Sequence, residues 1–247
     1  MITLNRTKIT PTIFPDGTSQ VWKLDEELLR SKTYNVTWDF THEGELFQLF
    51  QLVELLRYSC VPREMTLFMP FLPYGRQDKE VSNNNTFALK TFCNLIDTLN
   101  FDSVRTLDAH SNEASKWIRN FKNFEPTVHI DYVKYFILND QYDFAFPDKE
   151  ACDRYSKLYD LEGENVVIGN KVRDQCTGYI TSYDFEGEVD DKNILIVDDI
   201  CDGGMTFIIL AKNLLQSGAK SVNLYVIHGI FSKGIRVLKD AGIDRIF

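Results

Sequence analysis

This chain has few cysteines, and their spacing argues against the common cysteine-based sites. The 247 residues contain five, namely Cys60, Cys93, Cys152, Cys176 and Cys201. No pair has the short spacing of zinc ligands or of a redox-active CxxC motif, and the number is odd. The sequence therefore favours a protein of a reducing, cytoplasmic environment.

Long apolar runs and an excess of positive charge are also missing. No run approaches the roughly 20 residues needed to cross a membrane, and the first residues lack the apolar core of a signal peptide. Lysine and arginine total 27 against 36 acidic residues, which gives a net charge of -9. We therefore expect no membrane association and no general nucleic-acid binding, because the latter needs basic patches. A local basic pocket for a small phosphorylated ligand remains compatible with this charge.

The order of the predicted elements indicates two similar α/β halves. In the first half the pattern predicts helices over 43–58 and 86–99, and strands over 66–70 and 103–107. In the second it predicts strands over 144–146, 166–168, 194–197 and 222–227, a helix over 207–216 and a β-flag around 178–185. Strands that alternate with helices imply parallel sheets. Asn123, Glu125 and Pro126 break the pattern, so we predict domains over 1–125 and 126–247.

The most informative pattern is an acidic, glycine-containing segment after a buried strand. It reads Asp198-Asp199-Ile200-Cys201-Asp202-Gly203-Gly204-Met205-Thr206 and precedes an amphipathic helix. A loop at the carboxyl end of a parallel strand is where open α/β sheets bind ligands. Glycines let backbone N–H groups approach an anion, and the helix N-terminus adds partial positive charge. The aspartates suit sugar hydroxyls or Mg²⁺ carried by a phosphate, unless they only form turns and helix caps.

Two polar segments follow predicted strands in the first half. One is Pro73-Tyr74-Gly75-Arg76-Gln77-Asp78-Lys79, and the other is Asp108-Ala109-His110-Ser111. Arg76 offers a planar pair of donors for phosphate, and Gln77 can bind an adenine edge or a phosphate oxygen. The alternatives are a solvated surface turn for the first segment and an ordinary core or surface histidine for His110.

Taken in order, six segments resemble those of the ribose-phosphate diphosphokinase family, also called PRPP synthetases. They are Phe14-Pro15-Asp16-Gly17, the Pro73 to Lys79 segment, Asp108-Ala109-His110, Pro147-Asp148, Lys171 with Arg173, and His228-Gly229-Ile230-Phe231-Ser232. The acidic-glycine segment resembles the phosphoribosyl-pyrophosphate loop of the type I phosphoribosyltransferase fold. The resemblance implies an α/β protein of two type I phosphoribosyltransferase-like domains, with parallel sheets flanked by helices. The domain over 1–125 would bind ATP, and the domain over 126–247 would bind ribose phosphate.

The resemblance also implies a reaction and a role for individual residues. The family transfers the β,γ-diphosphoryl group of ATP, with Mg²⁺, to the C1 hydroxyl of ribose 5-phosphate, which gives PRPP and AMP. Catalysis would fall to Lys171 and Arg173, and Mg²⁺ would lie at His110 and Asp148. ATP would be bound by Phe14, Asp16, Arg76, Gln77, Asp78 and His110. The ribose and its 5-phosphate would be bound by Asp198, Asp199, Asp202, Gly203, Gly204, Met205 and Thr206.

Assembly also follows from the resemblance. The family's counterpart of Phe14 and Asp16 reaches into the ATP site of a neighbouring subunit. We therefore expect a homo-oligomer, at least a dimer, and we expect only small-molecule substrates as other partners.

The chain is short for the family and departs from it around the expected acceptor site. Gly203 stands where threonine is usual, and Met205 stands where glycine is usual. If that glycine allows a positive φ, Met205 must distort or widen the loop. Glu150 replaces a glycine near the expected sugar, and Thr18 replaces an acidic residue near the expected adenine.

Three functions remain open. The first is a minimal PRPP synthetase, including one of viral origin, which would act in the host cytoplasm. The second is an enzyme that accepts ADP-ribose, whose 5-phosphate is esterified, and forms ADP-ribose pyrophosphate for NAD⁺ resynthesis. The third is a non-catalytic regulatory homologue, like the PRPP-synthetase-associated proteins. The presence of Arg76, His110, Lys171, Arg173 and Asp198 favours catalysis over the third function.

Overall fold

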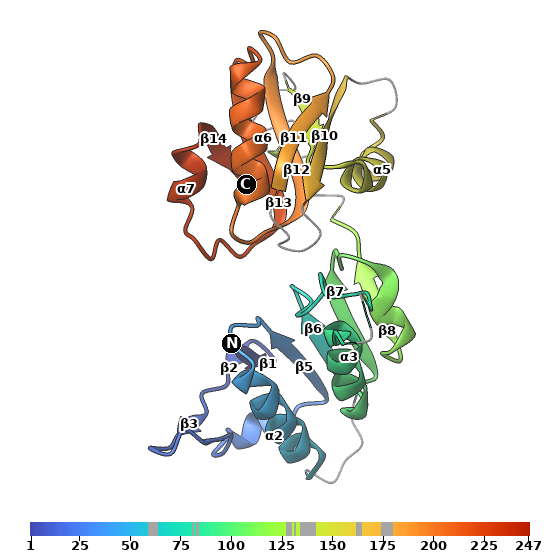
Figure 1. Ribbon diagram of the computed structural model, residues 1–247. Helices are drawn as coiled ribbons and strands as arrows, with labels where there is room; N and C mark the ends of the chain where they lie inside the picture. The colour runs from blue at the N-terminus through green and yellow to red at the C-terminus, as the bar shows by residue number, and fades with distance from the viewer. Residues whose placement is uncertain are drawn as a thin grey trace. The chain divides into compact units, whose positions relative to one another are not determined.

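The chain forms two compact units, Met1–Glu125 and Pro126–Phe247, in a computed structural model (Figure 1). The structure describes residues 1–58, 64–80, 82, 84–126, 130, 132–133, 142–161, 165–173 and 180–247, with the side chains of 171–173 and 180–183 left out. Within these ranges no helix is long and apolar enough to cross a membrane. Each unit is an α/β structure, as the sequence predicted.

A six-stranded sheet forms the centre of the N-terminal unit. In spatial order its strands are β2 (Thr7–Lys8), β1 (Ile2–Leu4), β5 (Thr33–Trp38), β6 (Glu64–Met69), β7 (Ser103–Leu107) and β8 (Phe121–Phe124). The last four are parallel to one another, whereas β1 runs antiparallel to both of its neighbours. Strands β3 (Thr12–Ile13) and β4 (Ser19–Gln20) form a separate hairpin.

The helices of this unit contribute apolar residues to the core beside the sheet. They are α1 (Glu26–Leu29), α2 (Gly44–Tyr58), α3 (Ala88–Thr98) and the short 3-10 helix η1 (Asn112–Lys116). On α2 the buried residues Leu49, Leu52 and Leu56 recur at helical spacing and join one core with α3 and the strands. This spacing explains why a helix was predictable at 43–58.

A second six-stranded sheet forms the centre of the C-terminal unit. In spatial order its strands are β11 (Ile180–Glu186), β10 (Val166–Arg173), β9 (Asp143–Phe146), β12 (Asn193–Cys201), β13 (Ser221–Gly229) and β14 (Ile243–Ile246). All neighbours are parallel except β10 and β11, which form an antiparallel hairpin at one edge. The helices are α5 (Lys149–Leu158), α6 (Met205–Gln216) and α7 (Arg236–Lys239).

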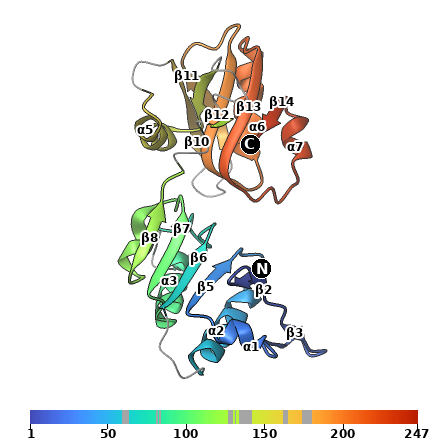
Figure 2. The same cartoon turned by 180° about the vertical axis from the view of Figure 1, so that it is seen from behind.

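Both faces of the second sheet are covered, because alternate residues of its central strands point to opposite sides. Ile194 and Ile196 of β12 join a core with α6, whereas Leu195 and Val197 join a different core with α5. Figure 2 shows the two helices from behind, with the strands between them. A strand buried on both faces has no polar alternation, which is why the sequence showed it as a continuous apolar run.

Several predicted elements are longer than their apolar patterns. The predicted strand 194–197 is part of β12, which continues through the two aspartates to Cys201. The predicted strand 166–168 continues as β10 to Arg173. Residues 121–124, placed in the predicted boundary region, form the edge strand β8. The predicted flag corresponds to the β10–β11 hairpin, although residues 174–179 lie outside the described structure.

Candidate functional site

The polar segments of the N-terminal unit meet at one edge of its sheet. Strands β6 and β7 are parallel neighbours, so the residues that follow them emerge at the same edge. A Cβ atom added to Gly75 would lie 3.7 Å from the Cβ of His110 and 3.1 Å from the carbonyl oxygen of Leu72. The structure therefore brings the Arg76 segment and His110 side by side, and the close approach leaves little room for a larger residue at Gly75.

Hydrogen bonds tie the Arg76 segment to its surroundings. The Tyr74 hydroxyl donates to Glu43 Oε1 at 2.6 Å, and Tyr74 itself has a φ of +62°. This hydrogen bond, with burial and the negative charge of Glu43, raises the pKa of Tyr74 to about 12. The amide of Gln77 donates to the Tyr74 carbonyl, and the Gln77 carbonyl accepts from the amide of Leu89 in α3. Hydrogen bonds to Glu43 and to Leu89 therefore fix the position of this segment.

Exposure differs among the predicted ATP-binding residues. Arg76 and Gln77 are exposed and available to a ligand, whereas Asp78 is only 7% exposed. His110 is half-buried at the end of β7. The preceding turn is fixed from β8, because the Asp108 amide donates to the Phe124 carbonyl and the Ala109 amide donates to Asn123 Oδ1. Asn123, interpreted as a boundary signal in the sequence, therefore supports the His110 turn.

The predicted nucleotide-contacting turn of Phe14 and Asp16 lies at the tip of the β3–β4 hairpin. Asp16 Oδ1 accepts hydrogen bonds from the Thr18 amide at 2.9 Å and from the Thr18 hydroxyl at 2.7 Å. These bonds lower the pKa of the Asp16 carboxyl. Gly17 closes the turn with a φ of +85°, and the side chain of Phe14 remains 37% exposed. Thr18, a departure from the family pattern, thus orients Asp16.

Four parallel strands of the C-terminal unit end at a second such edge. These strands are β10, β9, β12 and β13. Lys171 and Arg173 lie on β10, and Asp148 follows β9. Asp198 and Asp199 lie on β12, and His228 lies on β13. The pairing of Ile200 with His228 and of Cys201 with Gly229 keeps the ends of β12 and β13 together. The predicted residues of this unit therefore emerge along one edge.

The loop between β12 and α6 is compact. Its one residue with positive φ is Gly204, at +75°, and a Cβ atom there would lie 2.8 Å from Leu238 Cδ2. Met205 is the first residue of α6, has no positive φ, and is 52% exposed. Gly204 therefore supplies the left-handed residue of this loop, and Met205 takes a regular helical place, so no positive φ falls on Met205.

The segment after β13 closes over the end of β12. The amides of Ile230 and Phe231 both donate to the Cys201 carbonyl, at 2.9 and 3.1 Å. A Cβ atom on Gly229 would lie 2.1 Å from the Phe231 ring, so a larger residue there would require the ring to move. Beyond this turn, Lys233 lies with its Cε 3.6 Å from the position of a Cβ atom on Gly203. The sequence did not identify Lys233, which places an exposed cation beside the acidic-glycine loop.

The two adjacent aspartates of β12 have different surroundings. Strand alternation directs Asp199 to the α5 face and Asp198 to the α6 face. Asp199 is 6% exposed, and its Oδ2 lies 3.8 Å from Nη1 of Arg154 in α5. Its amide donates to Asp198 Oδ1 at 2.9 Å. Arg154 is a second residue that the sequence did not identify, because an isolated arginine on an amphipathic helix carries no distinctive signal.

The predicted metal ligands lie in different units. Asp148 follows β9 and accepts a hydrogen bond from the Ala151 amide at 2.9 Å, so it caps the N-terminus of α5. Glu150 is exposed in the first turn of that helix. Among the described residues no group of three or more His, Cys, Asp or Glu side chains is arranged to hold a metal ion. Magnesium often keeps its waters and binds through one or two carboxylates plus substrate phosphates, and Asp148 fits that mode.

The predicted catalytic residues lie on a strand rather than on a loop. Lys171 and Arg173 belong to β10, where they pair with Tyr183 and Ile180 of β11. Both residues are therefore part of a hairpin, and the positions of their side chains lie outside the described structure.

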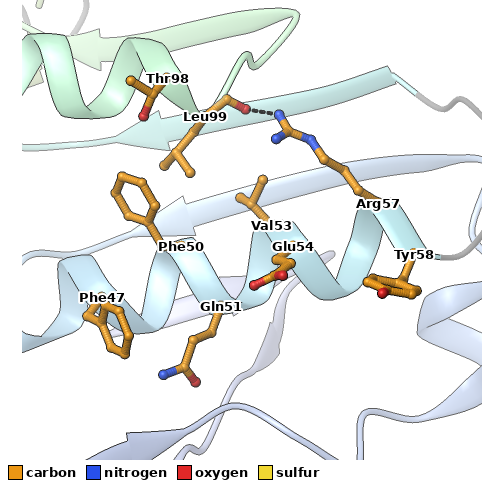
Figure 3. A pocket seen from close by; sticks show the side chains of 9 residues that line it. All are labelled: Phe47, Phe50, Gln51, Val53, Glu54, Arg57, Tyr58, Thr98 and Leu99. Carbon is orange, nitrogen blue, oxygen red and sulfur yellow. Dashed lines mark hydrogen bonds between the residues drawn. The ribbon is translucent and has the colours of Figure 1, made fainter.

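A separate groove of about 700 Å³ lies along the outer side of α2. Figure 3 shows Phe47, Phe50 and Tyr58 projecting from α2 toward this groove, and the Arg57 guanidinium donating to the Leu99 carbonyl. It contains none of the predicted site residues.

Comparison with known proteins shows relatives that cover most of the chain. The chain is 26% identical over 246 residues to a ribose-phosphate pyrophosphokinase of Saccharolobus solfataricus, covering 97% of this chain and 82% of that protein. It is 28% identical over 231 residues to ribose-phosphate pyrophosphokinase 4 of Saccharomyces cerevisiae, covering 89% and 69%. The chain is thus similar to ribose-phosphate pyrophosphokinases over most of its length. No model of a protein family matches it.

The fold agrees with this similarity. Phosphoribosylpyrophosphate synthetase from Mycobacterium smegmatis superposes with a TM-score of 0.83 at 20% sequence identity, covering 97% of this chain and 78% of that one. The predicted α/β architecture, with parallel sheets flanked by helices, is therefore confirmed. Apart from Phe14 and Asp16 on the separate hairpin, the residues predicted within each unit lie at the carboxyl edge of that unit's sheet.

Proposed function

We propose that this protein transfers the diphosphoryl group of ATP to the anomeric C1 hydroxyl of a ribose 5-phosphate moiety and releases AMP. The observation that carries the proposal is the sequence relation to ribose-phosphate pyrophosphokinases over nearly the whole chain. The polar and glycine residues at the carboxyl edges of the two sheets also support the proposal.

The N-terminal unit would bind ATP at its carboxyl edge. Arg76 and Gln77 are exposed on a segment held by hydrogen bonds, so their donors can meet phosphate or adenine without reordering the backbone. His110 lies against the same segment. The protruding hairpin with Phe14 would complete the adenine site of another subunit (Figure 1).

The C-terminal unit would bind the acceptor. Free amides at the N-terminus of α6 and the close backbone at Gly203 and Gly204 suit a phosphate. Lys233 beside Gly203 adds positive charge there. Asp198 and Asp199 would accept hydrogen bonds from ribose hydroxyls, which carboxylates do well.

The proposed chemistry is an in-line displacement. The C1 hydroxyl oxygen would attack the β-phosphorus of ATP and lose its proton, while the bond from that phosphorus to the oxygen bridging the α-phosphate breaks and AMP leaves. Such transfers gain their rate mainly from positioning and from neutralising charge. Lys171 and Arg173, at the end of β10, would stabilise the transferring group. His110 or Asp148 would hold Mg²⁺ that enters with ATP, and the ion would supply positive charge that stabilises the leaving group.

Two acceptors remain candidates, ribose 5-phosphate and ADP-ribose. Glu150 adds an exposed carboxylate in the first turn of α5, and Met205 adds an exposed side chain at the start of α6. A bare 5-phosphate dianion would be disfavoured by such neighbours more than an esterified phosphate, whose charge is lower. These two residues support ADP-ribose, whereas the names of the relatives support ribose 5-phosphate.

One assay tests the proposal. The purified protein is incubated with ATP, Mg²⁺ and either acceptor, AMP release is followed, and the product is identified by mass. We expect AMP with at least one acceptor and a product heavier by one diphosphoryl group. The triple variant Gly203→Thr, Met205→Gly, Glu150→Gly should shift the ratio of kcat/KM values toward ribose 5-phosphate. Release of AMP with neither acceptor would favour the alternative, a non-catalytic regulatory homologue.

We also propose that the protein works as a homo-oligomer. The exposed Phe14 and the ordered Asp16 lie on a hairpin that has no apolar cover within the described N-terminal unit. Light scattering at assay concentrations should give at least twice the chain mass. An active monomer would contradict this proposal without affecting the reaction.

A further inference from the structure

One ion pair links the acceptor edge to the helix that covers it. Oδ2 of Asp199 lies 3.8 Å from Nη1 of Arg154, and the side chains are 8% and 29% exposed. Asp199 comes from the end of β12, and Arg154 comes from the middle of α5. Since α5 directly follows β9, the pair connects two neighbouring strands of the sheet through the helix.

Asp199 is a carboxylate in a position where water cannot fully solvate it. A buried carboxylate needs an opposite charge or hydrogen-bond donors, and it loses its charge or moves when the partner is removed. Strand alternation places its neighbour Asp198 on the other face of the sheet. The structure therefore gives the two aspartates different supports.

Arg154 is itself held in place. Helix α5 is capped at its start by Asp148, and its residue Tyr155 is buried in the core beneath the helix. The guanidinium carbon of Arg154 lies 5.3 Å from the centre of the Tyr155 ring, within the range of a cation–π contact. The guanidinium therefore meets Asp199 from a rigid element, which a flexible surface arginine would not do.

We propose that Arg154 is a positioning residue that fixes the carboxylate of Asp199 for the hydroxyl groups of the acceptor's ribose. This inference rests on the proposed function, because the acceptor at this edge comes from that proposal. Arg154 acts through Asp199 and makes no contact with the acceptor itself. Asp198 binds the sugar without this support, so the two adjacent aspartates respond differently to a change in α5.

Variants of α5 separate this role from a general effect of charge. Arg154→Gln removes the cation and keeps a polar side chain, and Lys157→Gln removes an exposed cation one turn further along the same helix. We expect Arg154→Gln to weaken acceptor binding about 10-fold, with the KM for ATP unchanged, since losses of this order follow when a supporting partner is removed. Lys157→Gln should leave both unchanged, and Arg154→Lys should recover most of the loss because it keeps the charge.

A double-mutant cycle with Asp199→Asn tests whether Arg154 acts through Asp199. Binding of ribose 5-phosphate and of ADP-ribose is measured by calorimetry, and unfolding is measured by urea titration on the same four proteins. In the Asp199→Asn background, Arg154→Gln should cause little further loss of binding and little further loss of stability. A full further loss of binding there would show direct contact with the acceptor and overturn the positioning role.

The two proposals fail in different ways. Absence of binding of either sugar phosphate to the unsubstituted protein, together with absence of AMP release, would refute the proposed function. Unchanged acceptor binding by Arg154→Gln, in a protein that does release AMP, would overturn the role of Arg154 alone. Additive effects of the two substitutions on unfolding would also overturn it, because they would mean that the ion pair does not couple the residues.

Discussion

Gly204→Ala tests the packing of the acidic-glycine loop. Alanine in the left-handed conformation, at the observed φ of +75°, costs about 1 kcal/mol. The added Cβ atom would also lie 2.8 Å from Cδ2 of Leu238, well inside normal contact. Leu238 is 1% exposed and cannot rotate into solvent, so overpacking should add about 1–3 kcal/mol. We expect a total loss of roughly 2–4 kcal/mol in the free energy of unfolding.

Gly234→Ala is a matched control for this substitution. Gly234 has nearly the same φ, +76°, and a Cβ atom there meets nothing within 4 Å. Alanine at Gly234 should therefore cost only the conformational part, about 1 kcal/mol. The difference between the two variants measures the contact with Leu238.

The unit that unfolds can be identified by the choice of probe. The three tryptophans, Trp22, Trp38 and Trp117, all lie in the N-terminal unit. In urea titrations the loss caused by Gly204→Ala should appear in far-ultraviolet circular dichroism and leave the tryptophan transition unchanged. Equal losses for Gly204→Ala and Gly234→Ala would refute the reasoning, because the loop would then not be packed against Leu238.

The other predictions concern the reaction, the response to acid and a buried amide. Lys171→Ala should lower kcat by roughly 10²–10³-fold and leave ATP affinity nearly unchanged. Near-normal turnover in rapid-quench assays would refute the catalytic role of Lys171. Burial raises the pKa of the Glu45 carboxyl, but hydrogen bonds from the chain N-terminus, Trp38 and Thr41 outweigh it and lower the pKa to about 2. A folded-state pKa below the unfolded value of about 4.5 stabilises the folded protein at pH values above 4.5. The free energy of unfolding should therefore fall as the pH is lowered from 4.5 toward 2. In acid titrations, Glu45→Gln should make this fall less steep. Asn223 is 1% exposed, and its side-chain amide has no hydrogen-bond partner in the described structure. Asn223→Leu should therefore raise the free energy of unfolding by about 1 kcal/mol in urea titrations. A decrease in that free energy would indicate that a bound water satisfies the amide.

The sequence was sufficient to predict the fold because its strands and helices carry strong periodic signals. Parallel strands buried on both faces appear as apolar runs, and the helices between them show the 3.6-residue spacing. The ends of strands were less predictable. Asp198 and Asp199 look like loop residues by composition, yet β12 continues through them because β13 offers backbone partners as far as Gly229. Pairing with a neighbouring strand overrides local polarity here.

Residues that act through tertiary contacts could not be recognised from the sequence alone. Arg154 and Lys233 approach the acidic-glycine loop from other elements, and only the folded chain brings them there. Asn123 looked like a break in the pattern, although its side chain accepts a hydrogen bond from the turn before His110. Met205 was interpreted from the family position alone, which did not reveal that the preceding Gly204 carries the positive φ. Motif order located the site, and the supporting contacts required the structure.

The strand order of the C-terminal unit has a consequence for how acceptor choice can change. The chain adds β10 on one side of β9 and then returns to add β12 on the other. The helices that follow β9 and β12 therefore leave toward opposite faces and open a crevice between their first turns, at a topological switch point. The crevice is set by connectivity, and its chemistry is set by loop residues such as Glu150 and Gly203. Under the proposed function, a few loop substitutions would therefore be enough to change the acceptor, while the sheet beneath the loops stays the same.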